Sequence, residues 1–143
     1  MTTESALKAR LRETWRRAWD EGEVEALDDL VADDYERTTN GSERVLSAAE
    51  FKAEIVDTRR AFPDLTTTVT AVVEDGGTVA VFWTSTGTHR AELQGVPATR
   101  RSVTIHGSNL CHLDDEGRVR RELVTWDPSQ LLDALGIQTV RHD

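Results

Sequence analysis

Several classes of protein are excluded by what this sequence lacks. It has one cysteine, Cys111, in 143 residues, so no disulfide can form within the chain, and this suits a reducing compartment. No apolar run approaches the roughly 20 residues that a membrane-spanning helix needs. The polar start MTTESALKAR has no apolar stretch of the kind that a signal peptide contains. A cytoplasmic protein is therefore expected.

Basic residues are too few for a nucleic-acid-binding surface. The chain has 17 Lys and Arg against 26 Asp and Glu, a net charge of -9. A nucleic-acid backbone requires a basic face, so no nucleic acid is expected as a partner. The length is that of one domain over residues 1–143, large enough for a core and a pocket. The core should cover about residues 5–137 and leave a loose tail over 138–143.

Helical periodicity dominates the first half of the chain. Apolar residues at helical spacing predict an amphipathic helix over residues 3–21 and a short second helix over 23–31. An irregular or short extended piece follows and ends at the Asn-Gly turn of residues 40–41. The sequence SAAE at 47–50 is a capping box that opens a third helix, which Pro63 ends.

The second half has the composition of β-strands. Residues 65–74 and 78–89 are rich in threonine and valine and flank an Asp-Gly-Gly turn, which predicts a hairpin. A polar connection over 91–100 leads to a second hairpin over 101–127, and a last short helix is expected over 128–136. Helices followed by a meander of four long strands indicate the α+β class with an antiparallel sheet.

The second hairpin carries the most informative polar residues. Pairing Leu113 with Arg118 across a four-residue turn places Asn109 opposite Glu122, and directly opposed residues project from the same face. This face is expected to be buried, because alternate residues of a strand share one face and Asn109 shares its face with the apolar residues of the first strand, Val103, Ile105, Cys111 and Leu113. A carboxylate beside a carboxamide, near Trp126, is thus predicted inside an apolar wall. A slip of one residue would reverse the faces.

Five segments share their order and spacing with a known family. They are AWDEG at 18–22, AFPDL at 61–65, GTH at 87–89, GVPAT at 95–99 and D-x-x-x-L-L-x-x-L-G at 127–136. Over residues 7–136 the chain thereby resembles the SnoaL-like polyketide cyclases of the nuclear transport factor 2-like superfamily. The resemblance implies a cone of helices over a curved antiparallel sheet, a cystatin-like α+β barrel, with an apolar cavity. It also implies function without metal or cofactor, and a homodimer.

The resemblance also bears on the reaction. In the polyketide cyclases of the family, an aspartate on the last strand does acid/base work in an aldol ring closure, near a histidine on the preceding strand. Here the aspartate position falls on Val124 and the histidine position on Asn109. The superfamily further includes epoxide-opening hydrolases, isomerases and binding proteins, and the fold does not choose among them.

Glu122 and Asn109 are the leading catalytic candidates. Burial in an apolar cavity raises the pKa of a carboxylic acid from about 4.3, which would prepare Glu122 as a general acid or base. The alternatives are an ion pair with Arg120 or, in another register, a solvated side chain. Asn109 would orient a substrate oxygen or hold Glu122, and a satisfied core amide is the alternative.

Two further catalytic candidates have structural explanations. Asp127 begins the last helix as an N-cap, with proline and glutamine following at the first and third helical positions, and its predicted face is opposite to that of Glu122. His89 ends a strand and could protonate a substrate or bond to the next strand. His106 and His112 fall on the polar face, which favours surface or subunit contacts. No histidine or carboxylate pair has metal-binding spacing, so no metal is expected.

Aromatic residues suggest the walls of a cavity. Trp19 matches a family position that touches substrate. Several such rings around one cavity would suit a polycyclic or polyene ligand. The other substrate-binding candidates are Trp15, Tyr35, Phe51, Ile55, Phe62, Trp83, Ile105, Val124 and Trp126. Among them Tyr35, Phe51 and Phe62 fit a core better than a pocket, and Cys111 is expected as a small apolar filler.

Together these observations lead to a cofactor-independent cyclase that acts on a hydrophobic polyketide-type intermediate. Glu122 would be the acid/base group, Asn109 its partner, and Trp19 and Trp126 the walls. Holding a flexible chain in a reactive conformation can itself supply several kcal/mol. The alternatives are an epoxide-opening or isomerase enzyme and a non-catalytic binding or assembly module.

Overall fold

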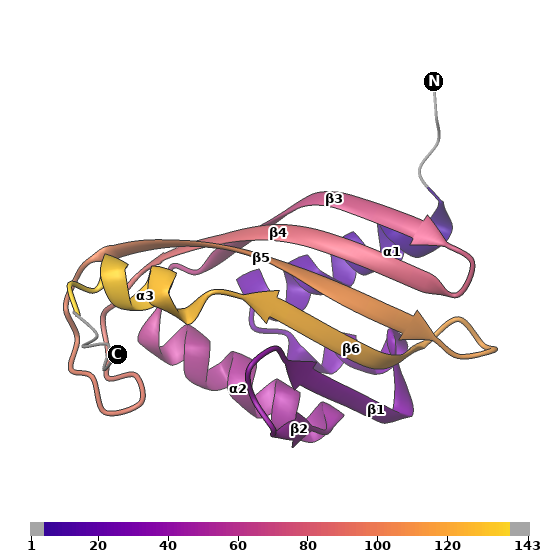
Figure 1. Cartoon of the computed structure of the whole chain (residues 1–143), viewed down its shortest axis with the longest axis horizontal. Coiled ribbons are helices and arrows are strands. Elements are labelled where there is room, and N and C mark those ends of the chain that lie inside the picture. Colours follow the sequence, from indigo (N-terminus) through magenta and orange to yellow (C-terminus); the bar gives the residue numbers. More distant parts are fainter. Residues whose placement is uncertain (1–4, 138–143) are drawn as a thin grey trace, which may run out of the picture.

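The computed structural model describes residues 5–137, in which helices lie against one face of a curved sheet (Figure 1). The predicted first helix is present as α1 (Ala6–Trp15), continued by a π-helical segment, Arg16–Asp20; the predicted residues 3 and 4 lie outside the described residues. The predicted second helix is a 3-10 helix, Val24–Asp29. Two further helices are α2 (Ala48–Ala61) and α3 (Pro128–Ala134). The predicted tail, residues 138–143, lies outside the described residues.

The sheet is mixed and open, in the order β2-β1-β6-β5-β4-β3. Its strands are β1 (Val31–Thr39), β2 (Val45–Leu46), β3 (Thr66–Asp75), β4 (Thr78–Thr88), β5 (Ser102–Leu113) and β6 (Val119–Trp126). The four-strand antiparallel meander is confirmed as β3 to β6. The expected α+β class, with helices on a curved sheet, is confirmed. The sheet differs in detail from a fully antiparallel one, because β1 pairs with β6 in parallel, and β2 and β3 remain edges.

Strand β1 occupies the stretch that the sequence presented as irregular or as a short extended piece. Its apolar signal is weak, because after Val31 and Ala32 the residues are Asp33, Asp34, Tyr35, Glu36 and Arg37. Only Tyr35 is an evident inward residue, and the equally buried Arg37 has the appearance of a surface residue in the sequence. Burial of Arg37 depends on a partner in β6, and local periodicity cannot show such a partner.

The final hairpin has a different register from the predicted one. Its turn spans five residues, 114–118, so Leu113 pairs with Val119, and a bulge then sets His112 opposite Arg121. Asn109 is consequently opposite Val124, and Glu122 is opposite Cys111. The displacement amounts to two residues, which preserves the predicted faces. The predicted Asn109–Glu122 pair is therefore not directly opposed, although both side chains are buried on the same face.

The predicted capping signals are confirmed. The Ser47 hydroxyl accepts the backbone N–H of Glu50 at 3.2 Å, and the Glu50 carboxylate accepts that of Ser47 at 3.1 Å. Asp127 caps α3 by accepting the N–H of Ser129 at 2.9 Å. No helix among residues 5–137 has the length and hydropathy needed to cross a membrane.

Replacing Ser47 with alanine tests the capping box. Ser47→Ala removes one acceptor of an orphan helix N–H and should lower the free energy of unfolding by about 1 kcal/mol in urea denaturation. The matched variant is Thr58→Ala, because Thr58 is a mid-helix residue of α2 whose hydroxyl bonds to the Glu54 carbonyl. Alanine has the higher helix propensity, so stability should hold or rise there. Equal losses in the two variants would contradict the assignment.

Candidate active site

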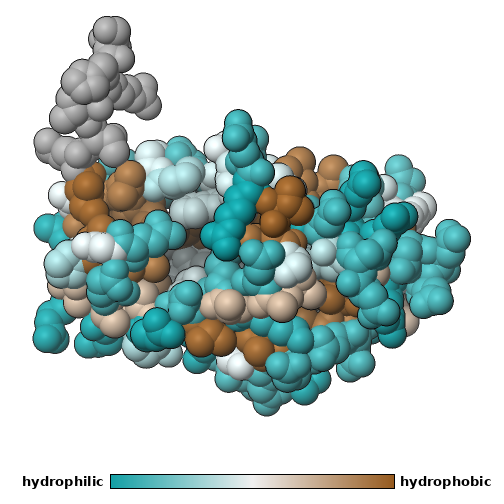
Figure 2. Space-filling view, turned by 90° about the horizontal axis from the view of Figure 1, so that it is seen from below, coloured by the Kyte–Doolittle hydropathy of each residue, from teal (hydrophilic) through white to brown (hydrophobic). Residues whose placement is uncertain are grey.

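A cavity of ≈ 760 Å³ lies between the helices and the concave face of the sheet. Seven of the predicted substrate-binding residues line it: Trp15, Trp19, Phe62, Trp83, Ile105, Val124 and Trp126. Tyr35, Phe51 and Ile55 are instead buried in the core cluster next to it. Charged residues of the lining, such as Arg44, Glu54 and Asp57, are exposed and mark the mouth near β2 and α2. Seen from the side of α2 and β2, hydrophobic residues gather around a hollow in the surface (Figure 2).

Glu122 is buried next to the cavity, and both of its carboxylate oxygens accept hydrogen bonds. Oε1 accepts the hydroxyl of Tyr35 and Nη1 of Arg37, the latter at 2.8 Å. Oε2 accepts Nδ2 of Asn109 at 2.7 Å and the thiol of Cys111 at 3.6 Å. Its side chain is 1% exposed and is absent from the cavity lining. Glu122 thus sits behind the cavity wall as an ion-paired acceptor, rather than as a carboxyl in an apolar surface.

The ion pair of Glu122 has a partner that the sequence analysis missed. The predicted alternative, Arg120, is at the surface and binds Asp34 at 3.0 Å. The partner is Arg37 of β1, whose side chain is 6% exposed and whose Cζ lies 3.9 Å from the centre of the Phe51 ring. Tyr35 and Arg37 lie two residues apart and thus on one face of β1. That spacing is the one signal in the sequence that could have indicated Arg37.

Electrostatics keep the donors around Glu122 protonated. Burial, and then the Glu122 carboxylate, raise the pKa of the Tyr35 hydroxyl far above its ordinary value, and the same two causes raise the pKa of the Cys111 thiol. Burial is the largest single influence on Arg37 and opposes its charge, but Glu122, Tyr35 and Glu54 together outweigh burial and hold the pKa of the guanidinium above its ordinary value. Neither Tyr35 nor Cys111 is therefore poised to act as an anionic nucleophile at neutral pH.

Asn109 presents the polar surface of the cavity floor. Its Nδ2 donates to Glu122 at 2.7 Å, and its Oδ1 accepts the indole N–H of Trp83 at 2.9 Å. These two bonds fix which end of the carboxamide carries the oxygen. A carboxamide has two donors and two acceptor positions, so one N–H and one lone pair remain beyond these contacts. Because Asn109 lines the cavity, its remaining N–H group can donate a hydrogen bond to an oxygen atom of a substrate.

Gly107 leaves the space that the indole ring of Trp83 occupies. The two residues are paired across β4 and β5, and a Cβ atom on Gly107 would lie 2.2 Å from Cζ2 of Trp83. The indole therefore lies over the glycine, where its N–H reaches Asn109. The requirement for glycine is steric, since only hydrogen fits under the ring.

The remaining catalytic candidates lie outside the cavity lining. His89 is fully buried; its Nδ1 accepts the N–H of Thr99 at 3.2 Å, and its ring lies 5.5 Å from that of Phe62. The bond is thus to the connection after β4, not to the next strand. Asp127 caps α3 and borders a shallow groove on the outer face of the sheet. His106 and His112 are exposed, as predicted.

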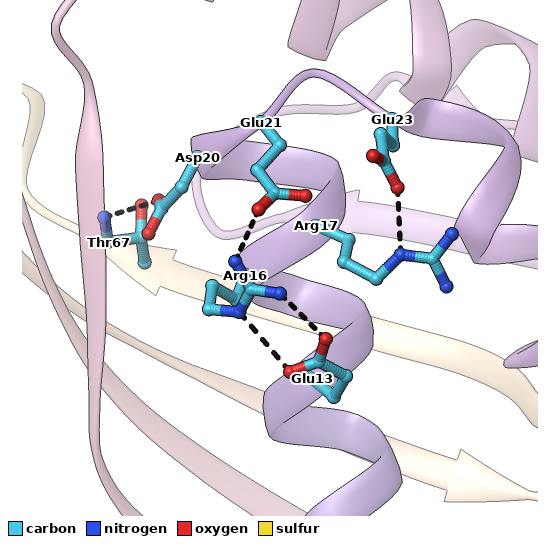
Figure 3. A network of polar contacts seen from close by, with 7 residues as sticks. All are labelled: Glu13, Arg16, Arg17, Asp20, Glu21, Glu23 and Thr67. Atoms are coloured by element: carbon cyan, nitrogen blue, oxygen red, sulfur yellow. Dashed lines mark hydrogen bonds and ion pairs between the residues drawn. The ribbon is translucent and has the colours of Figure 1, made fainter.

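Polar contacts tie the π-helical segment to its neighbours (Figure 3). Arg16 binds Glu13 at 2.7 Å and Glu21 at 2.5 Å, which ties α1 to the end of the π-helical segment. Asp20 accepts the N–H of Thr67 at 2.7 Å and so joins this segment to β3. The π-helical segment follows Trp15 and contains Trp19, and the side chains of both tryptophans line the cavity.

Comparisons with known proteins agree with this architecture. The family model of the SnoaL-like polyketide cyclase matches residues 9–135. The chain belongs to this family. No curated protein matches.

Solved structures of similar proteins extend over almost the whole chain. A candidate polyketide cyclase from Acidithiobacillus ferrooxidans is 27% identical, with a TM-score of 0.79 over 95% of this chain and 98% of that one. IdmH, a candidate polyketide cyclase from Streptomyces antibioticus, is 26% identical, with a TM-score of 0.78 over 93% and 100%. AclR, a candidate hydroxylase from Streptomyces galilaeus, is 25% identical, with a TM-score of 0.79 over 91% and 95%.

The family comparison gives the site its context. Val124 and Asn109, the two positions that the sequence resemblance singled out, are paired directly across β5 and β6, and both line the cavity. Within residues 5–137, no three side chains of histidine, cysteine, aspartate or glutamate form a metal-binding group. The buried polar side chains of the described cavity lining are the amide of Asn109 and the guanidinium of Arg37.

Removing the charge of Glu122 should be costly. Glu122→Gln leaves Arg37 as a buried cation without its counter-ion, and we expect the free energy of unfolding to fall by about 3–5 kcal/mol in urea denaturation. Asp34→Asn breaks the surface pair with Arg120, where the two side chains are 64% and 57% exposed, and should cost less than about 1 kcal/mol. Similar losses in both variants would argue against a buried ion pair.

A methyl group at position 107 should displace the indole. Gly107→Ala forces Trp83 out of its place, breaks its bond to Asn109 and should destabilise the fold by about 1–3 kcal/mol through overpacking. In ¹H–¹⁵N NMR spectra the indole N–H signal of Trp83 should shift, whereas Ser108→Ala, on the opposite face of β5, should leave it in place. An unmoved indole signal in Gly107→Ala would refute the steric role.

Asp20 should make stability depend on pH. Partial burial raises its pKa above the ordinary 3.8, although the Thr67 N–H works against this. A raised carboxyl pKa favours folding below 3.8, and this contribution is lost as pH rises through the folded-state value. Asp20→Asn should therefore gain stability relative to wild type between about pH 4 and 7 in urea denaturation series. The control is Asp115→Asn, which removes one negative charge at an exposed residue of the 114–118 turn. If the stability of the two variants depends on pH in the same way, Asp20 has no special effect.

Proposed function

We propose that this protein is a cyclase that closes a ring in a hydrophobic polyketide-type intermediate, without a cofactor and in the cytoplasm. The observation that carries the proposal is the cavity floor. It presents a rigidly held carboxamide, Asn109, and the ion-paired guanidinium of Arg37 within walls of four tryptophans, whereas the carboxylates of the lining are exposed at the mouth. Such a cavity is suited to fold an oxygenated apolar chain and to hold one of its oxygens.

The proposed reaction is an intramolecular aldol closure. A methylene between two carbonyl groups loses a proton to water, the resulting enolate carbon forms a bond to a distant carbonyl carbon, and the alkoxide oxygen is protonated. No atom is gained or lost overall. The free N–H of Asn109 would donate to the oxygen on which negative charge develops. Glu122 would act as a positioning residue, because it holds Asn109 and does not reach the cavity.

In this proposal the shape of the cavity supplies the remaining rate enhancement. The indoles of Trp15 and Trp19 close one side of the cavity, and Trp83 and Trp126 close the sheet side. Confinement of a flexible chain in a near-reactive conformation lowers the entropic part of the barrier. Val124 occupies the position at which the resemblance places the aspartate of the cyclases. Without that carboxylate, a larger part of the rate enhancement is expected from the shape of the cavity.

Ring opening of an epoxide is less well supported. That reaction requires a carboxylate in contact with water or with the substrate. The Glu122 carboxylate has four donors within the protein and is absent from the cavity lining. A non-catalytic binding module is the alternative of a different class.

One experiment separates these functions. Purified protein is incubated with a synthetic linear poly-β-ketone thioester, and products are followed by mass spectrometry and ¹H NMR. A cyclase yields a product of unchanged mass with new ring carbons, or its dehydrated form. Testing an epoxide of similar size in parallel detects a hydrolase by the gain of one water. A binding module shows saturable quenching of tryptophan fluorescence with no product, and this outcome contradicts the proposal.

The role of Asn109 has its own expected outcome. Asn109→Ala removes the proposed oxyanion donor and should lower kcat about 100-fold, in line with the loss of one such donor elsewhere, with a smaller effect on substrate affinity. Ser108→Ala, whose side chain lies on the outer face of the same strand, should retain kcat. If Asn109→Ala retains kcat as well, ring closure depends on shape alone and the donor role is wrong.

A further inference from the structure

The guanidinium of Arg37 has hydrogen-bond donors that the fold does not use. Arg37 is 5% exposed and is one of the residues that line the cavity. Its Nη1 donates to Oε1 of Glu122 at 2.8 Å, and the hydroxyl of Tyr35 donates to the same oxygen. A guanidinium carries five N–H donors, and within residues 5–137 the buried Nε of Arg37 has no hydrogen-bond partner. Buried donors without a partner are rare in folded proteins, so this group is a candidate for contact with a ligand.

Glu122 sets this guanidinium beside the amide of Asn109. Its Oε1 accepts from Arg37 at 2.8 Å, and its Oε2 accepts from Nδ2 of Asn109 at 2.7 Å. Because both oxygens belong to one carboxylate, the two donor groups are close neighbours. Strand pairing agrees, since Arg37 is aligned with Glu122 of β6 and Asn109 with Val124, the next residue on the same face. Arg37, Asn109 and Val124 line the cavity, whereas Glu122 does not.

Packing holds the two donor groups in fixed positions. The Cζ atom of Arg37 lies 3.9 Å from the centre of the Phe51 ring, and Phe51 is 1% exposed. Oδ1 of Asn109 accepts the indole N–H of Trp83 at 2.9 Å. Two rigid donor groups side by side favour a ligand with two oxygen atoms a short distance apart, because both oxygens can then be bound with little further loss of side-chain freedom.

Charge decides between two common groups with paired oxygens, a carboxylate and a β-dicarbonyl unit. Glu122 already neutralises Arg37, and Glu54 is a second carboxylate that acts on this guanidinium. A ligand carboxylate would bring a full negative charge close to that of Glu122 in a buried place, where like charges repel strongly. The two oxygens of a β-dicarbonyl unit accept hydrogen bonds as neutral groups. The site therefore favours the dicarbonyl.

We propose that Arg37 is a second substrate-binding residue, which together with Asn109 binds the two oxygens of a β-dicarbonyl unit. One oxygen accepts the remaining N–H of Asn109, and the other accepts an N–H of Arg37. The inference rests on the proposed function, because a poly-β-ketone chain is made of such units. A single donor lets a bound chain rotate about one hydrogen bond, whereas two donors also fix the direction of the chain in the cavity.

Three small ligands of similar size test the proposal by isothermal titration calorimetry of the purified full chain. They are the β-diketone benzoylacetone, the mono-ketone butyrophenone and the carboxylate phenylbutanoate. Benzoylacetone should bind about tenfold or more tightly than butyrophenone, which lacks the second oxygen and leaves one donor group without an acceptor. It should also bind more tightly than phenylbutanoate. Equal affinity for the two ketones overturns the proposal, and so does tighter binding of the carboxylate.

Replacing Arg37 with lysine separates recognition from folding. Arg37→Lys keeps a counter-ion for Glu122 but puts a point charge in place of the planar fork of N–H groups. The preference for benzoylacetone over butyrophenone should fall about tenfold, whereas the affinity for butyrophenone should change little. Arg120→Lys is the matched control, because Arg120 pairs with Asp34 at the surface and lies outside the cavity lining. It should keep the preference of wild type.

A double variant is used if circular dichroism and thermal melting show that Arg37→Lys does not fold. Arg37→Met combined with Glu122→Gln removes both charges and leaves no buried ion unpaired, and it should show the same loss of preference. A preference that survives in a folded Arg37 variant overturns the proposal. Binding is measured without turnover. Preference for the diketone without ring closure therefore contradicts the proposed function alone, and ring closure without this preference contradicts the role of Arg37 alone.

Discussion

The ion pair between Arg37 and Glu122 is the interaction on which the site depends. It joins β1 to β6, the two strands that pair in parallel, and it lies below the cavity with almost no exposure to solvent. A buried pair of this kind gains stability only when its remaining donors and acceptors are satisfied. Tyr35, Asn109 and Cys111 satisfy the carboxylate, and each of these side chains is thereby fixed at the core or the cavity floor.

In this arrangement the Glu122 carboxylate positions a neighbouring side chain and does not transfer protons. Glu122 orients Asn109, Trp83 holds the other end of the same amide, and Gly107 gives Trp83 its room. Glu122, Trp83 and Gly107 thus determine the orientation of the Asn109 amide without taking part in the reaction themselves. Rigid support of this kind makes a polar group selective, because the group cannot turn to follow a badly placed substrate.

Much of the fold was open to sequence reasoning because it rests on local patterns. The capping box at Ser47, the N-cap at Asp127 and the four-strand meander follow from residues close in sequence. The family resemblance was likewise carried by short segments in order. The buried face with Asn109 and Glu122 was correct because parity survives a two-residue change in register.

What the sequence determined by itself was therefore the class of fold, the helix boundaries set by caps, and the inward face of the last hairpin. Tertiary structure determined the strand β1, the partner of Glu122 and the bulge near Arg120. For β1 and the partner of Glu122 the physical reason is the same. A charged residue such as Arg37 can be buried only when a distant segment supplies its counter-ion, and that compensation exists between β1 and β6 and in neither strand alone.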